Sequence, residues 1–192
     1  VKELKSYKVP TILSLGAIKA MKRTDHIIRA FEIAKVTLSD LQLVIAGSSE
    51  GKYGAKVLKM IKASGYADSI EYLGKVSKEK KIELMHKSHL ICVTSVKEGW
   101  GLVVTEANSQ GTPAIVYNVD GLRDAVKNNE TGLICKENTP KDLAENIVNL
   151  LSNQEKYQSL RINAWEWSKE INFEESYKDF KNALNNFEII KL

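Results

Sequence analysis

Short apolar runs alternate along this chain with stretches in which apolar residues recur at helical spacing. A run that is apolar throughout predicts a strand covered on both faces, because such a strand has no solvent-facing side for polar residues. The predicted strands are residues 10–16, 41–47, 69–74, 89–95, 112–118 and 132–136.

The stretches between these runs have the pattern of amphipathic helices. In the first of them Ile27, Ile28 and Phe31 share one helix face, which is the face that a helix buries against a sheet. Ser77 stands where another helix begins and is a good N-cap residue. Helices are predicted over residues 24–36, 53–64, 77–88, 102–110, 120–128, 139–151, 154–169 and 173–186.

Strands that alternate with helices indicate βαβ units. The chain is therefore predicted to be an α/β protein with a doubly wound, Rossmann-like parallel sheet of about six strands. Ligands of such sheets bind at the carboxyl ends of the strands. The loops after the first, third and fourth strands are accordingly the places to look for a site.

Composition narrows the classes of function. The chain has 192 residues and a formal net charge of +4, with lysines spread along its whole length. That spread argues against a nucleic-acid partner, which is typically met by clustered basic residues. Cys92 and Cys135 lie in apolar runs and have no metal-ligand spacing, so we expect buried free thiols, a reducing cytoplasmic compartment and no metal site.

The stretch from Glu98 to Glu106 carries the most chemistry. It follows a predicted strand and opens a predicted helix, and Gly99 and Gly101 flank Trp100 there. Glycines let the backbone approach a ligand closely, and the start of a helix attracts phosphate. Either glutamate alone is most simply a surface charge. Two carboxylates beside a phosphate site instead suggest a ligand with hydroxyl groups to donate, as a nucleotide-sugar has.

Residues 98–132, EGWGLVVTEANSQGTPAIVYNVDGLRDAVKNNETG, resemble the donor-domain signature of family 4 (group 1) retaining glycosyltransferases of the GT-B fold. The pattern is a glutamate, seven residues and a second glutamate, followed by Gly-Thr-Pro, Gly-Leu-x-Asp and Thr-Gly-Leu. Upstream, LSLGAIKAMKRTDHIIRAF resembles the family's first strand and loop. The resemblance covers nearly the whole chain and implies the C-terminal, donor-binding half of a GT-B enzyme.

The resemblance also implies a role for each matching residue. Glu98 matches the glutamate near the donor sugar, Glu106 the glutamate that holds the ribose hydroxyls, and Lys22 the cation on the diphosphate. Catalysis is thus expected from Glu98 and Lys22. The other expected donor-binding residues are Gly16, Val76, Gly99, Trp100, Gly101, Leu102 and Val103.

One position departs from the family pattern. The family commonly places an arginine directly after the first-strand glycine, whereas this chain has Ala17 there. Lys19 lies two residues further on and is a candidate substitute. Without a second cation, stabilisation of the departing diphosphate would be weaker.

The resemblance divides the chain into three parts. Residues 1–9 are expected to be a linker from a missing N-terminal acceptor domain, and Val1 rather than Met at the start is consistent with a fragment. Residues 10–170 are expected to form the donor-binding domain. Residues 171–192 are expected to form a helix that packs on the missing domain, through which the protein would also reach a membrane surface.

The function expected from the resemblance is transfer of a hexose-type sugar from a nucleotide diphosphate sugar to a glycan or lipid acceptor, with no cofactor. The fragment is expected to be inactive without its N-terminal domain. Three alternatives stay open: a non-catalytic nucleotide-sugar-binding subunit, a GT-B-fold epimerase and, least favoured, an α/β interaction module without a ligand.

Overall fold

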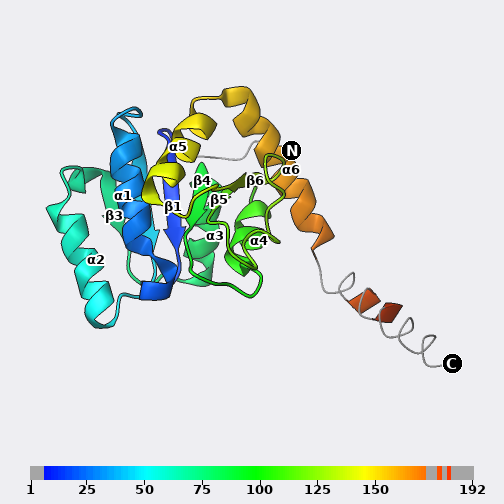
Figure 1. Ribbon diagram of the computed structural model, residues 1–192, viewed down its shortest axis with the longest axis horizontal. Coiled ribbons are helices and arrows are strands. Elements are labelled where there is room, and N and C mark those ends of the chain that lie inside the picture. The colour runs from blue at the N-terminus through cyan, green and yellow to red at the C-terminus, as the bar shows by residue number, and fades with distance from the viewer. Residues whose placement is uncertain (1–6, 172–176, 179–180, 183–192) are drawn as a thin grey trace.

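The computed structural model describes residues 7–171, 177–178 and 181–182. Over these residues six strands form one parallel sheet in the order β3-β2-β1-β4-β5-β6 (Figure 1). The strands are β1 Thr11–Leu15, β2 Gln42–Ala46, β3 Ile70–Tyr72, β4 Leu90–Val93, β5 Ala114–Val116 and β6 Gly132–Ile134. The predicted doubly wound sheet is confirmed.

Helices connect each strand to the next from β1 to β5, and helices cover both faces of the sheet. They are α1 Thr24–Lys35, α2 Gly51–Ala63, α3 Lys78–Lys87, α4 Leu102–Asn108, α5 Pro140–Leu151 and α6 Gln154–Glu170, with short 3-10 helices η1 Ala20–Lys22 and η2 Ala67–Ser69. The two short 3-10 helices have no apolar periodicity, which is why the hydrophobic pattern did not predict them.

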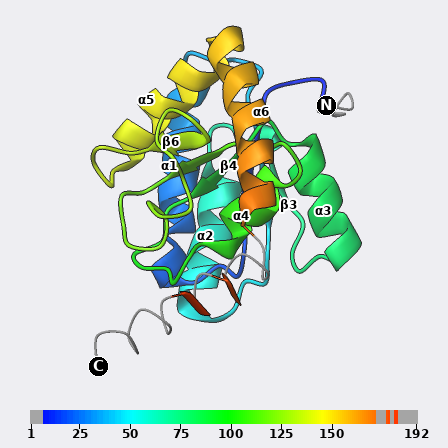
Figure 2. The ribbon, with the colours of Figure 1, turned by 90° about the vertical axis from the view of Figure 1, so that its right-hand side faces the viewer.

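Two core layers lie on opposite faces of the sheet. One packs α1, α2, α5 and the start of α6 against strand residues such as Ile12 and Ile115. The other packs α3 and α4 against strand residues such as Leu13 and Val116. Figures 1 and 2 show this three-layer arrangement, with α6 running past the β6 edge toward α4. Arg161 of α6 donates from Nε to the carbonyl of Gly111 at 3.2 Å, just beyond α4.

The strand order sets the position of a site. β1 lies between β2 and β4, so the chain winds outward in one direction from β1 to β3 and in the other from β4 to β6. The connections that leave the carboxyl ends of the neighbouring strands β1 and β4 therefore run in opposite directions across the sheet. This switch point is where doubly wound sheets bind ligands.

The helix predicted over residues 120–128 is wrong. That segment is a series of turns, in which Arg123 N–H bonds to the Val119 carbonyl at 3.1 Å and Ala125 N–H to the Gly121 carbonyl at 3.3 Å. Gly121 has a φ of 77°. A left-handed residue at the start of the segment interrupts helical geometry. The apolar residues that suggested a helix are instead buried as part of these turns.

The ends of the chain are only partly described. Tyr7 is the first described residue, and its N–H donates to the Lys87 carbonyl at 2.7 Å. The helix predicted over residues 173–186 lies mostly outside the described residues, so its packing stays a prediction. Within the described residues, no helix combines the length and the apolar character that crossing a bilayer demands.

Candidate functional site

The two loops at the switch point are joined to each other. Thr94, directly after β4, donates from its hydroxyl to the carbonyls of Lys22 at 2.8 Å and Arg23 at 3.0 Å. The N–H of Val96 donates to the carbonyl of Met21 at 2.8 Å. Three hydrogen bonds thus fix the end of the β1 loop against the start of the β4 loop.

This junction brings together the two residues predicted to be catalytic. Lys22 Nζ donates to Glu98 Oε1, although the two residues are far apart in the sequence. Ser95 also donates to Glu98 Oε1, at 2.6 Å. The side chain of Glu98 is 17% exposed and that of Lys22 is 33% exposed. Both side chains are therefore largely buried but still reached by solvent, and Lys22 lines a small recess at this edge of the sheet.

The ion pair sets the protonation state of Glu98. Burial alone would raise the pKa of this carboxyl group. The hydrogen bonds from Lys22 and Ser95 and the charge of Lys22 outweigh burial, so the pKa of Glu98 lies below its ordinary value. Glu98 is consequently a carboxylate at neutral pH and serves as a hydrogen-bond acceptor rather than as an acid.

Close packing around two glycines shapes the loops. At Gly121, which has a φ of 77°, a side-chain carbon would collide with the Glu98 carbonyl and come within 2.8 Å of the Gly99 carbonyl carbon. At Gly47 it would collide with the carbonyl oxygen of Gly16. The 119–125 turns thus support the loop that carries Glu98, and the β2 loop supports the glycine that ends the first strand.

The predicted donor-binding residues of the β4 loop lead directly into α4. Gly101 has a φ of 77° and is the N-cap of α4, and the first bond of the helix runs from Val104 N–H to the Gly101 carbonyl at 2.8 Å. Leu102 is 70% exposed. Trp100 is half-buried and donates from its indole N–H to the Thr105 hydroxyl at 3.0 Å, which fixes the ring over the first turn of the helix.

The remaining predicted positions surround the same edge. Gly16 and Val103 line the recess together with Lys22. Val76 is partly buried against the core layer that also holds Val103. Whether Val76 meets a nucleobase stays a prediction.

The second glutamate of the motif is held separately from the first. Glu106 lies on α4, and Lys81 of α3 donates to its Oε1 at 2.6 Å. The side chain of Glu106 is 46% exposed and that of Lys81 is 31% exposed. Each glutamate of the motif therefore has a lysine partner, and the two lysines come from different elements.

The position where the family has arginine is Ala17 in the loop after β1. Ala17 is partly exposed, and Lys19 nearby is exposed. Lys19 has an extended backbone and precedes η1. In the part of the chain that the structure describes, no acid forms an ion pair with the Lys19 ammonium group, which leaves this cation open to solvent at the site edge.

Sequence reasoning missed four residues of the site. Thr94, Ser95, Lys81 and Gly121 act through contacts between segments distant in the sequence. A serine or threonine after a strand, or one lysine among several on a helix, is too common to signal such a role. Only Gly121 carried a signal, because it belongs to the Gly-Leu-x-Asp part of the motif.

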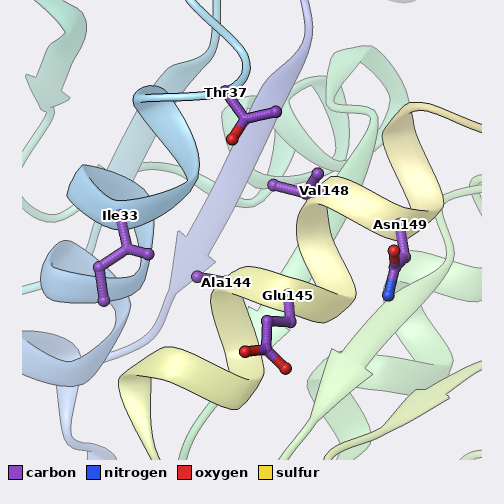
Figure 3. A pocket seen from close by; sticks show the side chains of 6 residues that line it. All are labelled: Ile33, Thr37, Ala144, Glu145, Val148 and Asn149. Atoms are coloured by element: carbon purple, nitrogen blue, oxygen red, sulfur yellow. The ribbon is translucent and has the colours of Figure 1, made fainter.

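One hollow lies away from this site. It has a volume of about 400 Å³ and lies between α1 and α5 (Figure 3). Its lining residues are Ile33, Thr37, Ala144, Glu145, Val148 and Asn149. None of the predicted site residues is among them, and Glu145 is its one charged lining residue.

Side chains that commonly bind metals do not cluster in the part of the chain that the structure describes. Among residues 7–171, 177–178 and 181–182, no group of three His, Cys, Asp or Glu side chains is placed to hold a metal ion. That a metal is not required stays a prediction from the family resemblance.

Fold and site together define a class of protein. A doubly wound α/β domain with a cation, a carboxylate and a glycine-capped helix start at its switch point has the arrangement with which such domains bind nucleotides. The sequence model of the family described as "Glycosyl transferases group 1" matches residues 1–167. The chain belongs to this family of glycosyltransferases.

Curated relatives agree with the family assignment. A D-inositol 3-phosphate glycosyltransferase of Rhodococcus jostii is 30% identical over 155 residues, which are 78% of this chain and 34% of the relative. An N-acetyl-alpha-D-glucosaminyl L-malate synthase of Bacillus anthracis is 28% identical over 150 residues, 78% of this chain and 38% of the relative. The chain thus spans between a third and a half of the length of such relatives.

Solved structures agree on the fold. The Anabaena protein HepE in complex with UDP and glucose superposes with a TM-score of 0.81 at 17% identity, over 92% of this chain and 48% of that chain. The C-terminal domain of a group 1 glycosyltransferase from Francisella tularensis gives a TM-score of 0.74 at 17% identity, over 85% of this chain and 92% of that chain. The predicted Rossmann-like fold is confirmed, and it matches the fold of these glycosyltransferase structures.

Proposed function

We propose that this chain is the donor-binding half of a retaining glycosyltransferase that moves a hexose-type sugar from a nucleotide diphosphate sugar to a glycan or lipid acceptor. The observation that carries the proposal is the ion pair of Lys22 and Glu98 at the switch point. It gives one recess a cation for phosphate and an acceptor for sugar hydroxyl groups. HepE, whose fold is similar, was crystallised with UDP and glucose.

Lys22 stabilises the leaving group in this proposal. When the bond between the anomeric carbon and the diphosphate breaks, negative charge collects on the departing phosphate oxygens. The ammonium group of Lys22 and the first-turn N–H groups of α4 are donors placed to meet that charge. The acceptor hydroxyl bonds to the anomeric carbon on the same face, and its proton leaves with the diphosphate.

Glu98 exchanges partners when the donor binds. A diphosphate competes with Glu98 for Lys22, because it carries more negative charge than one carboxylate. Ser95 remains hydrogen-bonded to Glu98 and keeps the carboxylate in place. The Glu98 oxygen that Lys22 releases is then an acceptor for a hydroxyl of the donor sugar. Glu106 is assigned to the ribose hydroxyls on the same principle.

The proposal also requires an acceptor pocket, which we place outside this chain. Curated relatives are two to three times as long as their match to this chain. We assign the acceptor pocket to a preceding domain, from which the linker at residues 1–9 would come. Location in the cytoplasm, with contact to a membrane surface through that domain, belongs to this proposal.

Ala17 gives one alternative a specific basis. Without an arginine directly after Gly16, Lys22 faces the diphosphate with Lys19 as an exposed cation of the same loop. A subunit that binds nucleotide-sugars without transferring them would tolerate this arrangement. An assay of donor hydrolysis and transfer by the longer protein separates the two functions.

Thermal shift tests the binding claim directly. A ligand at a hundred times its Kd stabilises a protein by about 2.7 kcal/mol, so millimolar UDP or GDP is expected to raise the Tm of this chain. Lys22→Met and Glu106→Gln are expected to reduce that rise. Lys87→Met and Glu166→Gln are matched controls, because these residues form ion pairs on α3 and α6 outside the site. If neither nucleotide raises the Tm, the proposed function is wrong.

A further inference from the structure

In the part of the chain that the structure describes, Lys81 is the one lysine of α3 that forms an ion pair with another helix. Lys80 and Lys87 both pair with Glu83 on α3 itself. Lys81 instead reaches α4 and donates to Glu106 Oε1 at 2.6 Å. Its side chain is the least exposed of these three lysines, at 31%.

The two helices hold this contact at a fixed spacing. Leu84 and Met85 of α3 pack in the same core layer as Val104 and Ala107 of α4, and all four are buried. At the start of α3, the hydroxyl of Ser77 accepts the N–H of Lys80 at 3.2 Å, and the Ser77 carbonyl accepts the N–H of Lys81 at 2.9 Å. The backbones on both sides of the ion pair are therefore anchored.

Lys81 has two consequences for Glu106. An exposed glutamate samples several rotamers, and ordering such a side chain on binding costs free energy. Lys81 restricts that sampling before a ligand arrives. The ammonium group also offsets the charge of a carboxylate that would otherwise repel an anionic ligand nearby. It occupies Oε1 and leaves Oε2 to accept from ligand hydroxyls.

We propose that Lys81 is a positioning residue that holds Glu106 for the paired hydroxyl groups of a ribose, so that the site selects ribonucleoside over 2′-deoxyribonucleoside diphosphates. The inference rests on the proposed function, in which Glu106 meets the ribose. A carboxylate only accepts hydrogen bonds, and the vicinal hydroxyls of ribose are two adjacent donors. Removal of one hydroxyl takes away one of the two ligand donors that the positioned carboxylate would accept.

Affinities for UDP and 2′-deoxy-UDP test this inference, or GDP and 2′-deoxy-GDP if GDP gives the larger thermal shift. Wild type is expected to bind the ribonucleotide more tightly than the deoxy analogue. Lys81→Met is expected to weaken ribonucleotide binding by about five- to tenfold, the effect of losing one pre-ordered side chain, while the affinity for the deoxy analogue changes less than twofold. Lys81→Arg should retain part of the preference.

Lys80→Met is the matched control, because it removes the same charge from the same helix, and among the described residues the Lys80 ammonium group pairs with Glu83 rather than with Glu106. It should leave both affinities unchanged. Equal weakening of both ligands by Lys81→Met would make Lys81 a general cation for phosphate and overturn the inference. Unchanged affinities would make it a surface ion pair and overturn it too. If wild type binds neither nucleotide, the proposed function itself fails, and the inference fails with it.

Discussion

Lys22 forms an ion pair with an acid of its own site. Its ammonium group and the Ser95 hydroxyl both donate to Glu98 Oε1. In the proposed function, a diphosphate displaces Glu98 from this cation because it carries more negative charge. Because the residues are a third exposed or less, the pair is screened less than a surface ion pair.

The Glu98 interaction predicts a pH dependence of stability. The folded pKa of Glu98 is below its ordinary value of 4.5. The stabilisation is therefore present above that value and is lost as the pH falls through the folded pKa. Between pH 6 and about pH 3 the unfolding free energy of wild type should fall more than that of Glu98→Gln. Urea unfolding at several pH values measures both.

A control for this experiment is Glu145→Gln on α5, whose carboxylate lies 4.0 Å from Lys141 on an exposed helix face. Its acid-dependent loss of stability should match that of wild type. Parallel curves for wild type and Glu98→Gln would show that the Lys22 pair contributes nothing to folding.

The backbone conformation and close packing of Gly121 predict that a side chain there lowers both stability and nucleotide affinity. Its φ of 77° and its contact with the Glu98–Gly99 backbone exclude a side chain. Gly121→Ala should lower the unfolding free energy by about 1–3 kcal/mol, the usual magnitude for a residue forced into this backbone region. It should also weaken UDP binding by shifting the loop of Glu98. Chemical denaturation and calorimetric titration measure the two effects.

Gly65 provides the comparison for Gly121. A side-chain carbon there meets nothing within 4 Å. Gly65→Ala should leave the nucleotide affinity unchanged. If Gly121→Ala were equally harmless to affinity, the 119–125 turns would not support the site.

At the scale of elements, α3 and α4 act together. The N-cap of α3 fixes the turn that carries Lys81, and α4 carries Glu106. Periodicity and cap signals predicted both helices from the sequence. The contact between them depends on how they pack on the sheet, and no pattern within either helix encodes that packing.

The N-cap of α3 is testable by itself. Ser77→Ala removes the hydroxyl that accepts from Lys80 N–H and should cost about 1 kcal/mol of unfolding free energy. Ser77→Asp retains a capping oxygen and should cost little. Thermal unfolding measures both variants. Equal losses in the two variants would mean that packing of the turn, rather than the cap, is what Ser77 provides.

At the scale of the whole molecule, strand order determines where the chemistry lies. Adjacency of β1 and β4 brings Lys22 and Glu98 together, and the α6 helix closes the far edge of the sheet beside α4. In the proposed function, this chain supplies the donor site and a preceding domain supplies the acceptor pocket. Binding and transfer should therefore be separable.

If donor binding and sugar transfer need different parts of the protein, the isolated chain should show only the first. The 192-residue protein should bind UDP or GDP and transfer no sugar, whereas a longer protein that includes the preceding domain should transfer it. Calorimetry of nucleotide binding and a radiolabelled-sugar assay measure the two activities. Sugar transfer by the isolated chain would overturn the assignment of acceptor binding to another domain.

The sequence by itself determined the α/β class, the positions of the six strands and the ordered motif from Glu98 to Gly132. These are local properties, since periodicity and spacing follow from neighbours along the chain. It predicted a helix over residues 120–128 because apolar spacing alone does not reveal that Gly121 adopts a left-handed backbone and packs under another loop.

Only the tertiary structure decided which side chains meet. Lys22 with Glu98 and Lys81 with Glu106 are contacts between segments that the parallel sheet and its crossovers bring together. A lysine on a helix is indistinguishable in sequence from the lysines beside it. What distinguishes Lys81 from its neighbours is the direction and reach of its side chain in the folded protein. An ion pair requires two charges on separate rigid elements to come to the same point.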